Sequence, residues 1–124
     1  MADHGIHKLA DWPLEKVTPL FQKRTMVGEN VMMVWTQSEP GCHAQGHAHP
    51  HEQAFWILKG EMDVRLGDKI TKCVEGDVIL IPPNQEHEMW CPKGTEFMSV
   101  LCPIRQDLLP GVEVPHHLRI KEQA

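Results

Sequence analysis

The stretch His47-Ala48-His49-Pro50-His51-Glu52-Gln53 places three imidazoles within seven residues, directly before the apolar segment 54–58. In an extended strand successive side chains alternate between faces, so this spacing places His47, His49 and Gln53 on one face. Histidines that share a face can bind one metal ion, because neutral imidazole is a common ligand of divalent metals. A further nitrogen ligand must come from elsewhere, and His87 is the candidate because it also follows a strand-like apolar run. The sequence therefore predicts a metal site formed by His47, His49, Gln53 and His87.

The composition is that of an ordinary globular domain. The 124 residues are enough for one domain with a sizeable core, and 41% are hydrophobic and 23% charged. A formal net charge of −5 argues against nucleic acid as the main partner. No apolar run reaches the about 18 residues of a membrane span, and residues 1–7 lack the pattern of a secretion signal. We therefore expect a soluble, cytoplasmic protein that binds neither nucleic acid nor a membrane.

The four cysteines are widely spaced and form no Cys-x-x-Cys pair; they are Cys42, Cys73, Cys91 and Cys102. In a chain without a secretion signal, reduced thiols are expected rather than a disulfide framework. Cys42 lies near the histidine-rich stretch, where a small, partly buried side chain is the preferred interpretation over a reactive thiol.

Short apolar runs separated by turn residues predict an all-β fold. Residues 31–35 suit a strand buried on both faces, and residues 62–66 alternate between apolar and polar side chains as in a half-buried strand. Gly60 is expected to break the chain between two strands, and Gly67-Asp68-Lys69 predicts a hairpin turn. The predicted strands cover residues 31–35, 53–58, 62–66, 70–74, 78–81 and 96–101. This pattern indicates an antiparallel sandwich or small barrel with the histidines inside.

The two ends of the chain are predicted to be irregular. Pro13 and Pro19 interrupt roughly the first 25 residues, which are too short and too interrupted for a stable helix. Their apolar side chains can nevertheless pack along a sheet or across to a partner subunit. We therefore predict an N-terminal arm that packs on the barrel at residues 1–27, the barrel itself at residues 28–105, and an irregular C-terminal tail at residues 106–124.

Two spaced motifs resemble those of the cupin family. The first runs Gly41, five residues, His47-x-His49, three residues, Gln53, six residues, Gly60. The second runs Gly76, five residues, Pro82-x-Asn84-x-x-His87. The resemblance covers roughly residues 28–102. It implies a double-stranded β-helix, or jelly roll, with one divalent metal held by His47, His49, Gln53 and His87.

Gln53 stands where most cupins have a metal-binding glutamate. A neutral amide leaves the site more positive, so the ion becomes a stronger Lewis acid, suited to an anionic or enolate-like oxygen. The change also removes the carboxylate of the two-His-one-carboxylate triad that many iron oxygenases use. Glu52 is a minor alternative ligand, because Pro50 can disturb the alternation of the strand. Zn, Ni, Mn and Fe all suit this ligand set.

The chain is similar in particular to small cupins that linearise unsaturated uronates in pectin breakdown, and to polyketide-cyclase cupins with a His/His/Gln/His site. In the uronate enzymes the last strand carries an aspartate, an aromatic residue and an arginine. Arg105 matches the arginine, whereas Ser99 and Leu101 replace the other two. Arg105 is therefore a candidate to bind a substrate carboxylate, with a surface pair to Asp107 as the alternative. His51 is a candidate catalytic residue that contacts the metal ligands or the substrate, with a solvent-facing position as the alternative.

These features predict a metal-dependent enzyme. We expect a divalent ion to act as a Lewis acid in isomerisation, cyclisation or lyase chemistry on a small substrate with a carbonyl or carboxylate group. A non-haem iron dioxygenase and a non-catalytic module that binds a small ligand are the alternatives. Because residues 53–58 are apolar on both alternating faces, a homodimer that covers Ala54, Trp56 and Leu58 is also expected.

Overall fold

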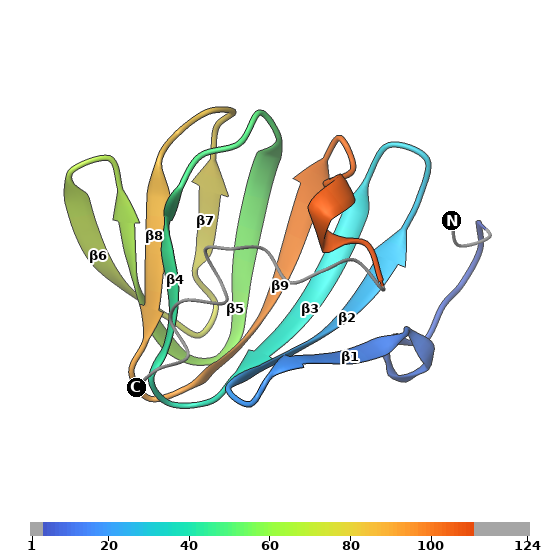
Figure 1. Cartoon of the computed structure of the whole chain (residues 1–124), viewed down its shortest axis with the longest axis horizontal. Coiled ribbons are helices and arrows are strands. Elements are labelled where there is room, and N and C mark those ends of the chain that lie inside the picture. Colours follow the sequence, from blue (N-terminus) through green and yellow to red (C-terminus); the bar gives the residue numbers. More distant parts are fainter. Residues whose placement is uncertain (1–3, 111–124) are drawn as a thin grey trace.

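The computed structural model describes residues 4–110, except for the side chain of Asp107, and over this range it is built almost entirely of β-strands (Figure 1). No helix in this range is long and apolar enough to cross a bilayer. The strands are β1 (Leu14–Thr18), β2 (Phe21–Val27), β3 (Met32–Ser38), β4 (Cys42–His47), β5 (Glu52–Leu66), β6 (Lys69–Val74), β7 (Val78–Ile81), β8 (His87–Cys91) and β9 (Thr95–Cys102). Two short 3-10 helices, η1 (Leu9–Asp11) and η2 (Gln106–Leu108), flank them.

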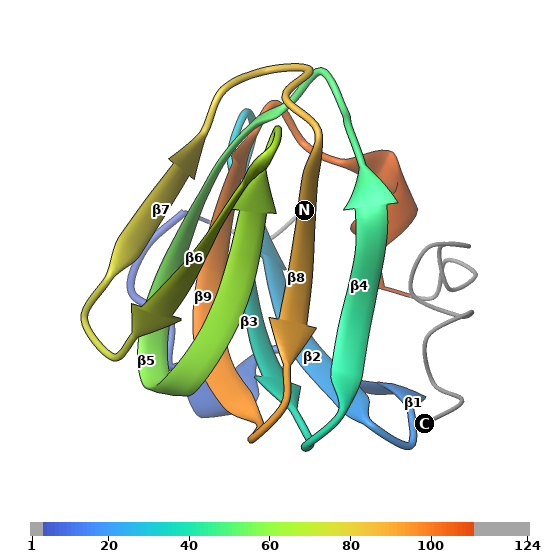
Figure 2. The ribbon, with the colours of Figure 1, turned by 90° about the vertical axis from the view of Figure 1, so that its left-hand side faces the viewer.

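The strands form two antiparallel sheets that share β5. The first sheet has the order β1-β2-β3-β9-β5-β7, and the second has the order β4-β8-β5-β6. The first half of β5 pairs with β7 and β9, whereas its second half pairs with β6 and β8. Seen from the side, β4 and β8 lie in front of β9, β3 and β2 (Figure 2). This arrangement is a jelly roll and confirms the predicted fold class.

Strand β5 runs through Gly60 without a break. The residue has a φ of 83°, and a Cβ at this position would lie 2.7 Å from the carbonyl oxygen of Gly94. Glycine is the residue that tolerates both the left-handed backbone and the close approach. The expectation that Gly60 separates two strands is therefore wrong, because the residue lies where one long strand passes from the first sheet to the second.

The space between the sheets is filled by side chains from alternate strand positions. Phe55 and Ile57 of β5 are almost completely buried, and the ring of Phe55 meets that of Phe97 edge-on, with the centroids 5.5 Å apart. Strand β3 alternates between buried and half-buried residues, with Met33 and Trp35 on its outer face. The expectation that this strand is buried on both faces is therefore wrong.

Residues 14–27 are more regular than the sequence pattern indicates. Strand β1 pairs with β2, and β2 pairs with β3 from Phe21 to Val27. The two prolines flank β1 and do not interrupt it, which is a position that strands tolerate. The prediction of an irregular arm is therefore wrong for residues 14–27. The barrel boundaries at 28 and 105 stay a prediction, and residues 111–124 of the tail lie outside the described range.

Candidate metal centre

Three histidines converge inside one end of the barrel. His47 ends β4, His49 lies in the loop that follows, and His87 begins β8. One ring nitrogen from each histidine lies within 4.8 Å of the other two. The ring centroids are 4.3 Å apart for His47 and His87, 5.0 Å for His49 and His87, and 5.5 Å for His47 and His49. The structure thus brings together the three histidines that the motif spacing indicates.

This convergence does not arise from alternation along one strand. Strand β4 ends at His47 and β5 begins at Glu52, so residues 48–51 form a loop. The backbone N–H of Asn84 donates to the carbonyl oxygen of His49 at 2.7 Å, which ties this loop to the turn before β8. Asn84 itself adopts a φ of 65°, a conformation that asparagine tolerates. The interpretation of His47 and His49 as one face of a strand is therefore wrong, although the loop brings both rings to the same place.

Each imidazole is oriented by a hydrogen bond from its Nδ1 to a backbone carbonyl two residues away. These bonds measure 2.9 Å for His47, 3.0 Å for His49 and 2.9 Å for His87. A carbonyl only accepts, so each Nδ1 carries the proton and each Nε2 keeps its lone pair. Nε2 of His87 is buried and has no hydrogen-bond partner among the described residues. Such ring nitrogens, each with the other nitrogen bonded to a carbonyl, fit the way histidine holds a metal.

Gln53 lies against this cluster with its amide oxygen toward His49. Its Oε1 is 2.9 Å from Nε2 of His49, and its own Nε2 donates to Oγ of Ser99 at 3.4 Å. Because Nε2 of His49 is unprotonated, two acceptors face each other here, and a cation between them would satisfy both. Glu52, the minor alternative ligand, is exposed on the opposite face of β5. The contact from Ser99 to Gln53 is a feature that the motif spacing did not indicate.

Burial keeps His49 and His87 in the neutral form that binds metal. It lowers the pKa of His87 to about 4, an effect that the hydrogen bond to Gln85 partly offsets and the neighbouring His47 and Arg105 reinforce. Burial also lowers the pKa of His49, again with help from the positive charge of Arg105. A metal ion therefore competes with few protons at these nitrogens.

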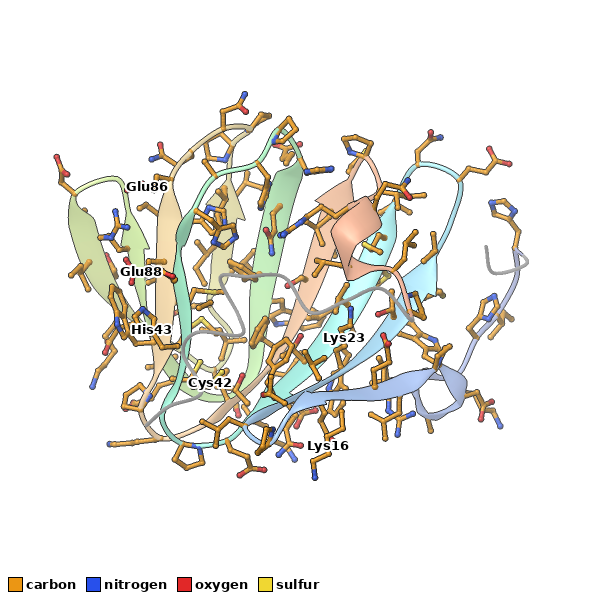
Figure 3. The ribbon with its side chains drawn as sticks, viewed as in Figure 1. Lys16, Lys23, Cys42, His43, Glu86 and Glu88 are labelled. Carbon is orange, nitrogen blue, oxygen red and sulfur yellow. The ribbon has the colours of Figure 1, made fainter. Side chains whose placement is uncertain are left out.

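Arg105 and a second buried cation line the cavity that adjoins this cluster. The cavity has a volume of about 60 Å³ and is lined by residues of both sheets, including His47 and Gln53. Arg105 and Lys23 are 6% and 5% exposed. Nζ of Lys23 donates to the carbonyl oxygen of Leu108 at 2.6 Å, which places it beneath η2 (Figure 3). None of the lining residues is acidic, although Oε1 of Glu15, outside the lining, lies 3.7 Å from Nζ of Lys23 and offsets part of its charge.

The sequence pattern did not single out Lys23, because lysine is rarely buried and one lysine in a strand carries no motif. The alternative pairing of Arg105 with Asp107 concerns a side chain outside the described residues. His51 is half-buried with its ring 5.3 Å from that of His49, and its Nδ1 has no hydrogen-bond partner in the described part of the chain. It is not among the residues that line the cavity. A catalytic role for Arg105 or His51 stays a prediction.

The thiols of Cys42 and Cys91 also line the cavity. All four cysteines are free, as expected. Burial raises the pKa of Cys91 to about 12, and the neighbouring Cys42 adds to this effect. The Cys91 thiol therefore stays protonated near neutral pH, and a protonated thiol is a poor nucleophile.

Comparison with known proteins places this fold and site in one family. Residues 34–102 match the family model described as a cupin domain. No protein with a curated description matches the sequence. The chain therefore belongs to the cupin family. Its jelly-roll fold agrees with this assignment.

Solved structures share the fold at low sequence identity. An RmlC-like cupin from Shewanella frigidimarina is 22% identical with a TM-score of 0.80, covering 86% of this chain and 97% of that chain. KdgF from Halomonas sp. is 19% identical with a TM-score of 0.79, covering 86% and 100%. A single-substitution variant of oxalate decarboxylase from Bacillus subtilis is 21% identical with a TM-score of 0.70, covering 82% of this chain and 31% of that chain. At these identities the likeness shows the fold.

Replacing a ligand histidine tests the metal centre. His47→Ala or His87→Ala should weaken Zn²⁺ binding by about 100-fold or more, since changing even an outer-shell partner typically costs 10–100-fold. The fold should persist, because the core is formed by apolar side chains such as Phe55 and Ile57. Metal content per chain and far-ultraviolet circular dichroism measure the two effects. His4→Ala, at an exposed histidine, is the control. Full metal occupancy in either variant would show that the ligand assignment is wrong.

The metal-free protein should lose stability in mild acid. His87 titrates near 6.5 in the unfolded chain, but its folded pKa is about 4 because it is buried. Between these values the unfolded chain binds the proton more strongly. The free energy of unfolding is therefore highest above pH 6.5. It falls as the pH is lowered toward about 4, by up to roughly 1 kcal/mol per pH unit for such a histidine. Urea unfolding of chelator-treated protein at about pH 7 and about pH 5 should show a smaller loss for His87→Leu than for wild type. If wild type and His87→Leu lose the same free energy of unfolding, the titration of His87 is not the cause of the acid sensitivity.

Proposed function

We propose that this chain is a metal-dependent enzyme that uses a divalent ion as a Lewis acid on a small, anionic, oxygenated substrate. The reaction class is isomerisation, cyclisation or elimination. The observation that supports it most is the charge of the cavity, where neutral Gln53 stands in place of a carboxylate and Arg105 is buried. No acid is found among the lining residues. A cavity with this charge favours a carboxylate or a developing oxyanion.

The side chains of His47, His49, Gln53 and His87 would hold the ion. Bound there, Zn, Ni, Mn or Fe would supply a Lewis acid that polarises a carbonyl or carboxylate oxygen. Arg105 would orient the substrate by binding a carboxylate through two parallel N–H donors. The cavity of about 60 Å³ would take only a small part of the substrate. An oxalate decarboxylase shares this fold, which is compatible with a short carboxylate.

Proton transfer requires a base near the metal, and His51 is the residue we propose. The cavity lining contains no carboxylate for this task, and the ring of His51 lies beside His49 with an unpartnered, buried Nδ1 among the described atoms. Because His51 does not line the cavity, its side chain would have to turn toward the substrate. Wild-type turnover by a His51→Gln variant would remove His51 from the reaction.

The Gln53→Glu variant separates the reaction classes. It should bind Zn²⁺ more tightly, because a carboxylate is a better ligand, yet turn substrate over more slowly, by about 10-fold or more, because its charge opposes the substrate oxygen. Metal affinity, turnover and dioxygen uptake are measured, with unsaturated uronates, oxalate and polyketone-like compounds as the first substrates. Gln22→Glu adds the same charge outside the cavity lining and serves as the control.

Each other outcome points to a different function. An iron dioxygenase would keep or gain activity with Gln53→Glu and would consume dioxygen, because the change restores the two-His-one-carboxylate triad. A binding module would show no turnover in either form and only a changed ligand affinity. Faster anaerobic turnover in the variant would contradict the Lewis-acid proposal.

We also propose that the enzyme is a homodimer built on the outer face of the first sheet. Trp56, Val78 and Leu80 are 54%, 61% and 62% exposed. Trp56 lies opposite Val78 and Ala54 opposite Leu80 across β5 and β7, so these four side chains form one apolar patch, with Glu52 beyond its edge on the same face of β5. A second copy of the chain suits this face, because an apolar surface is complementary to itself across a two-fold axis.

The Trp56→Glu variant tests this interface. It would bury an unpaired charge between the subunits at a cost of about 3–5 kcal/mol, which should dissociate the dimer. Light scattering should report half the wild-type mass. Ile70→Glu, at an apolar residue of β6 that is 59% exposed, is the control and should leave the mass unchanged. A monomeric wild type, or an unchanged mass for Trp56→Glu, would contradict the proposal.

A further inference from the structure

The outer face of the second sheet carries a charged network, on the side of the sheet opposite to the histidine cluster. Figure 3 labels three of its members, His43, Glu86 and Glu88, along β4 and at β8. Arg65 of β5 is the fourth. The network lies on the side of the sheet that faces away from the cavity, and none of its residues lines that cavity. The network is nevertheless connected to the metal centre, because it contacts the part of β4 that precedes His47.

A bulge in β4 determines which way His47 points. Ala44 lies opposite Met89, and both are buried in the core, whereas His47 lies opposite His87. Two residues of β4, at 45 and 46, therefore face one residue of β8, Glu88. Without this extra residue, position 46 would lie opposite His87 and His47 would point to the outer face, because side chains alternate along a strand. Bulges commonly redirect a side chain in this way.

Arg65 and Glu88 hold this bulge from outside. Arg65 lies opposite Glu88 across β5 and β8. It donates to Oε1 of Glu88 from Nη2 at 2.9 Å and from Nε at 3.3 Å. Its Nη1 donates to Oε1 of Glu86 at 2.9 Å and to the carbonyl oxygen of Gly67 at 2.7 Å. The other oxygen of Glu88 bonds to Nε2 of His43, so the network joins β5, β8 and β4.

Gly46 makes room for this contact. A Cβ at position 46 would lie 2.6 Å from Nη2 of Arg65 and 3.1 Å from Oε1 of Glu88. The φ of Gly46 is outside the left-handed region, so its backbone conformation does not require glycine. The absence of a side chain is needed because the guanidinium of Arg65 and the carboxylate of Glu88 pack against the bulge.

We propose that Arg65 and Glu88 are positioning residues for the metal centre. Clamped over Gly46, the pair fixes the bulge that turns His47 toward His87. The inference rests on the metal centre proposed above and adds to it residues that touch neither the ion nor the cavity. Exposed ion pairs contribute little to stability, but these side chains are only 20% and 16% exposed and make several bonds. Their effect should therefore appear in metal geometry more than in stability.

Affinity for Zn²⁺ alone tests this role, measured by competition with a chromophoric chelator. Glu88→Gln and Arg65→Met should each weaken binding by about 10-fold or more, as outer-shell changes do. Glu61→Gln is the matched control, because Glu61 lies on the same strand as Arg65 and pairs with Lys72 and Lys93 away from the bulge. It should bind Zn²⁺ as wild type does.

A rescue experiment distinguishes positioning from a general loss of stability. Gly46→Ala should also weaken Zn²⁺ binding, because its methyl group displaces the guanidinium. Adding Arg65→Ala to Gly46→Ala should then cause little further loss, so the two effects are not additive. The visible absorption bands of the Co²⁺-loaded variants should shift, which reports a changed ligand geometry. If Arg65→Met does not fold, Arg65→Lys replaces it and should bind with intermediate affinity, since one ammonium cannot make all the bonds.

Two results would overturn the inference in distinguishable ways. In the first, wild type binds Zn²⁺ and the Glu88, Arg65 and Gly46 variants bind it equally well, with unchanged Co²⁺ spectra. The positioning role is then wrong, whereas the metal centre is supported. If wild type itself binds no Zn²⁺, the metal centre and the positioning role fall together.

Discussion

The pairing of His47 with His87 across β4 and β8 is the constraint on which the rest of the site depends. It fixes two ring nitrogens inside the barrel, where burial limits the water that would otherwise satisfy them. The loop at residues 48–51 then places His49 beside this pair, and the start of β5 places Gln53 there. Backbone carbonyls take the Nδ1 protons, so the lone pairs on Nε2 point to a common place. The fold thus imposes the donor set before any ion arrives.

The electrostatics of the cavity follow from the same burial. Burial lowers the pKa of His49 and His87, and so keeps both rings neutral. A neutral Gln53 and a buried Arg105 leave nothing in the lining to offset the charge of a divalent ion. An anionic ligand would supply negative charge inside the cavity, where the lining has none, which is the physical basis for proposing an anionic substrate.

Local patterns in the sequence were enough to predict β3, both halves of β5, β6, β7 and β9, together with the candidate ligands, because short apolar runs and motif spacing are local properties. They did not predict β4 or β8, the two strands that carry His47 and His87. They were not enough for β2, whose stability comes from pairing with β3 along its length. Nor did they show that Gly60 lies within one continuous strand. Lys23, Ser99 and the contact of Arg65 with Glu88 depend on which strands are neighbours, and this information appears only when the sheets have been formed.

The central claim is that one ion is held by His47, His49, His87 and Gln53. A crystal structure recorded at the absorption edge of the metal that copurifies with the protein tests it most directly. We expect one anomalous peak about 2.0–2.2 Å from Nε2 of each histidine and from Oε1 of Gln53, with an open position toward Arg105. An ion bound through Glu52, through the Nδ1 atoms or elsewhere on the protein would contradict the claim.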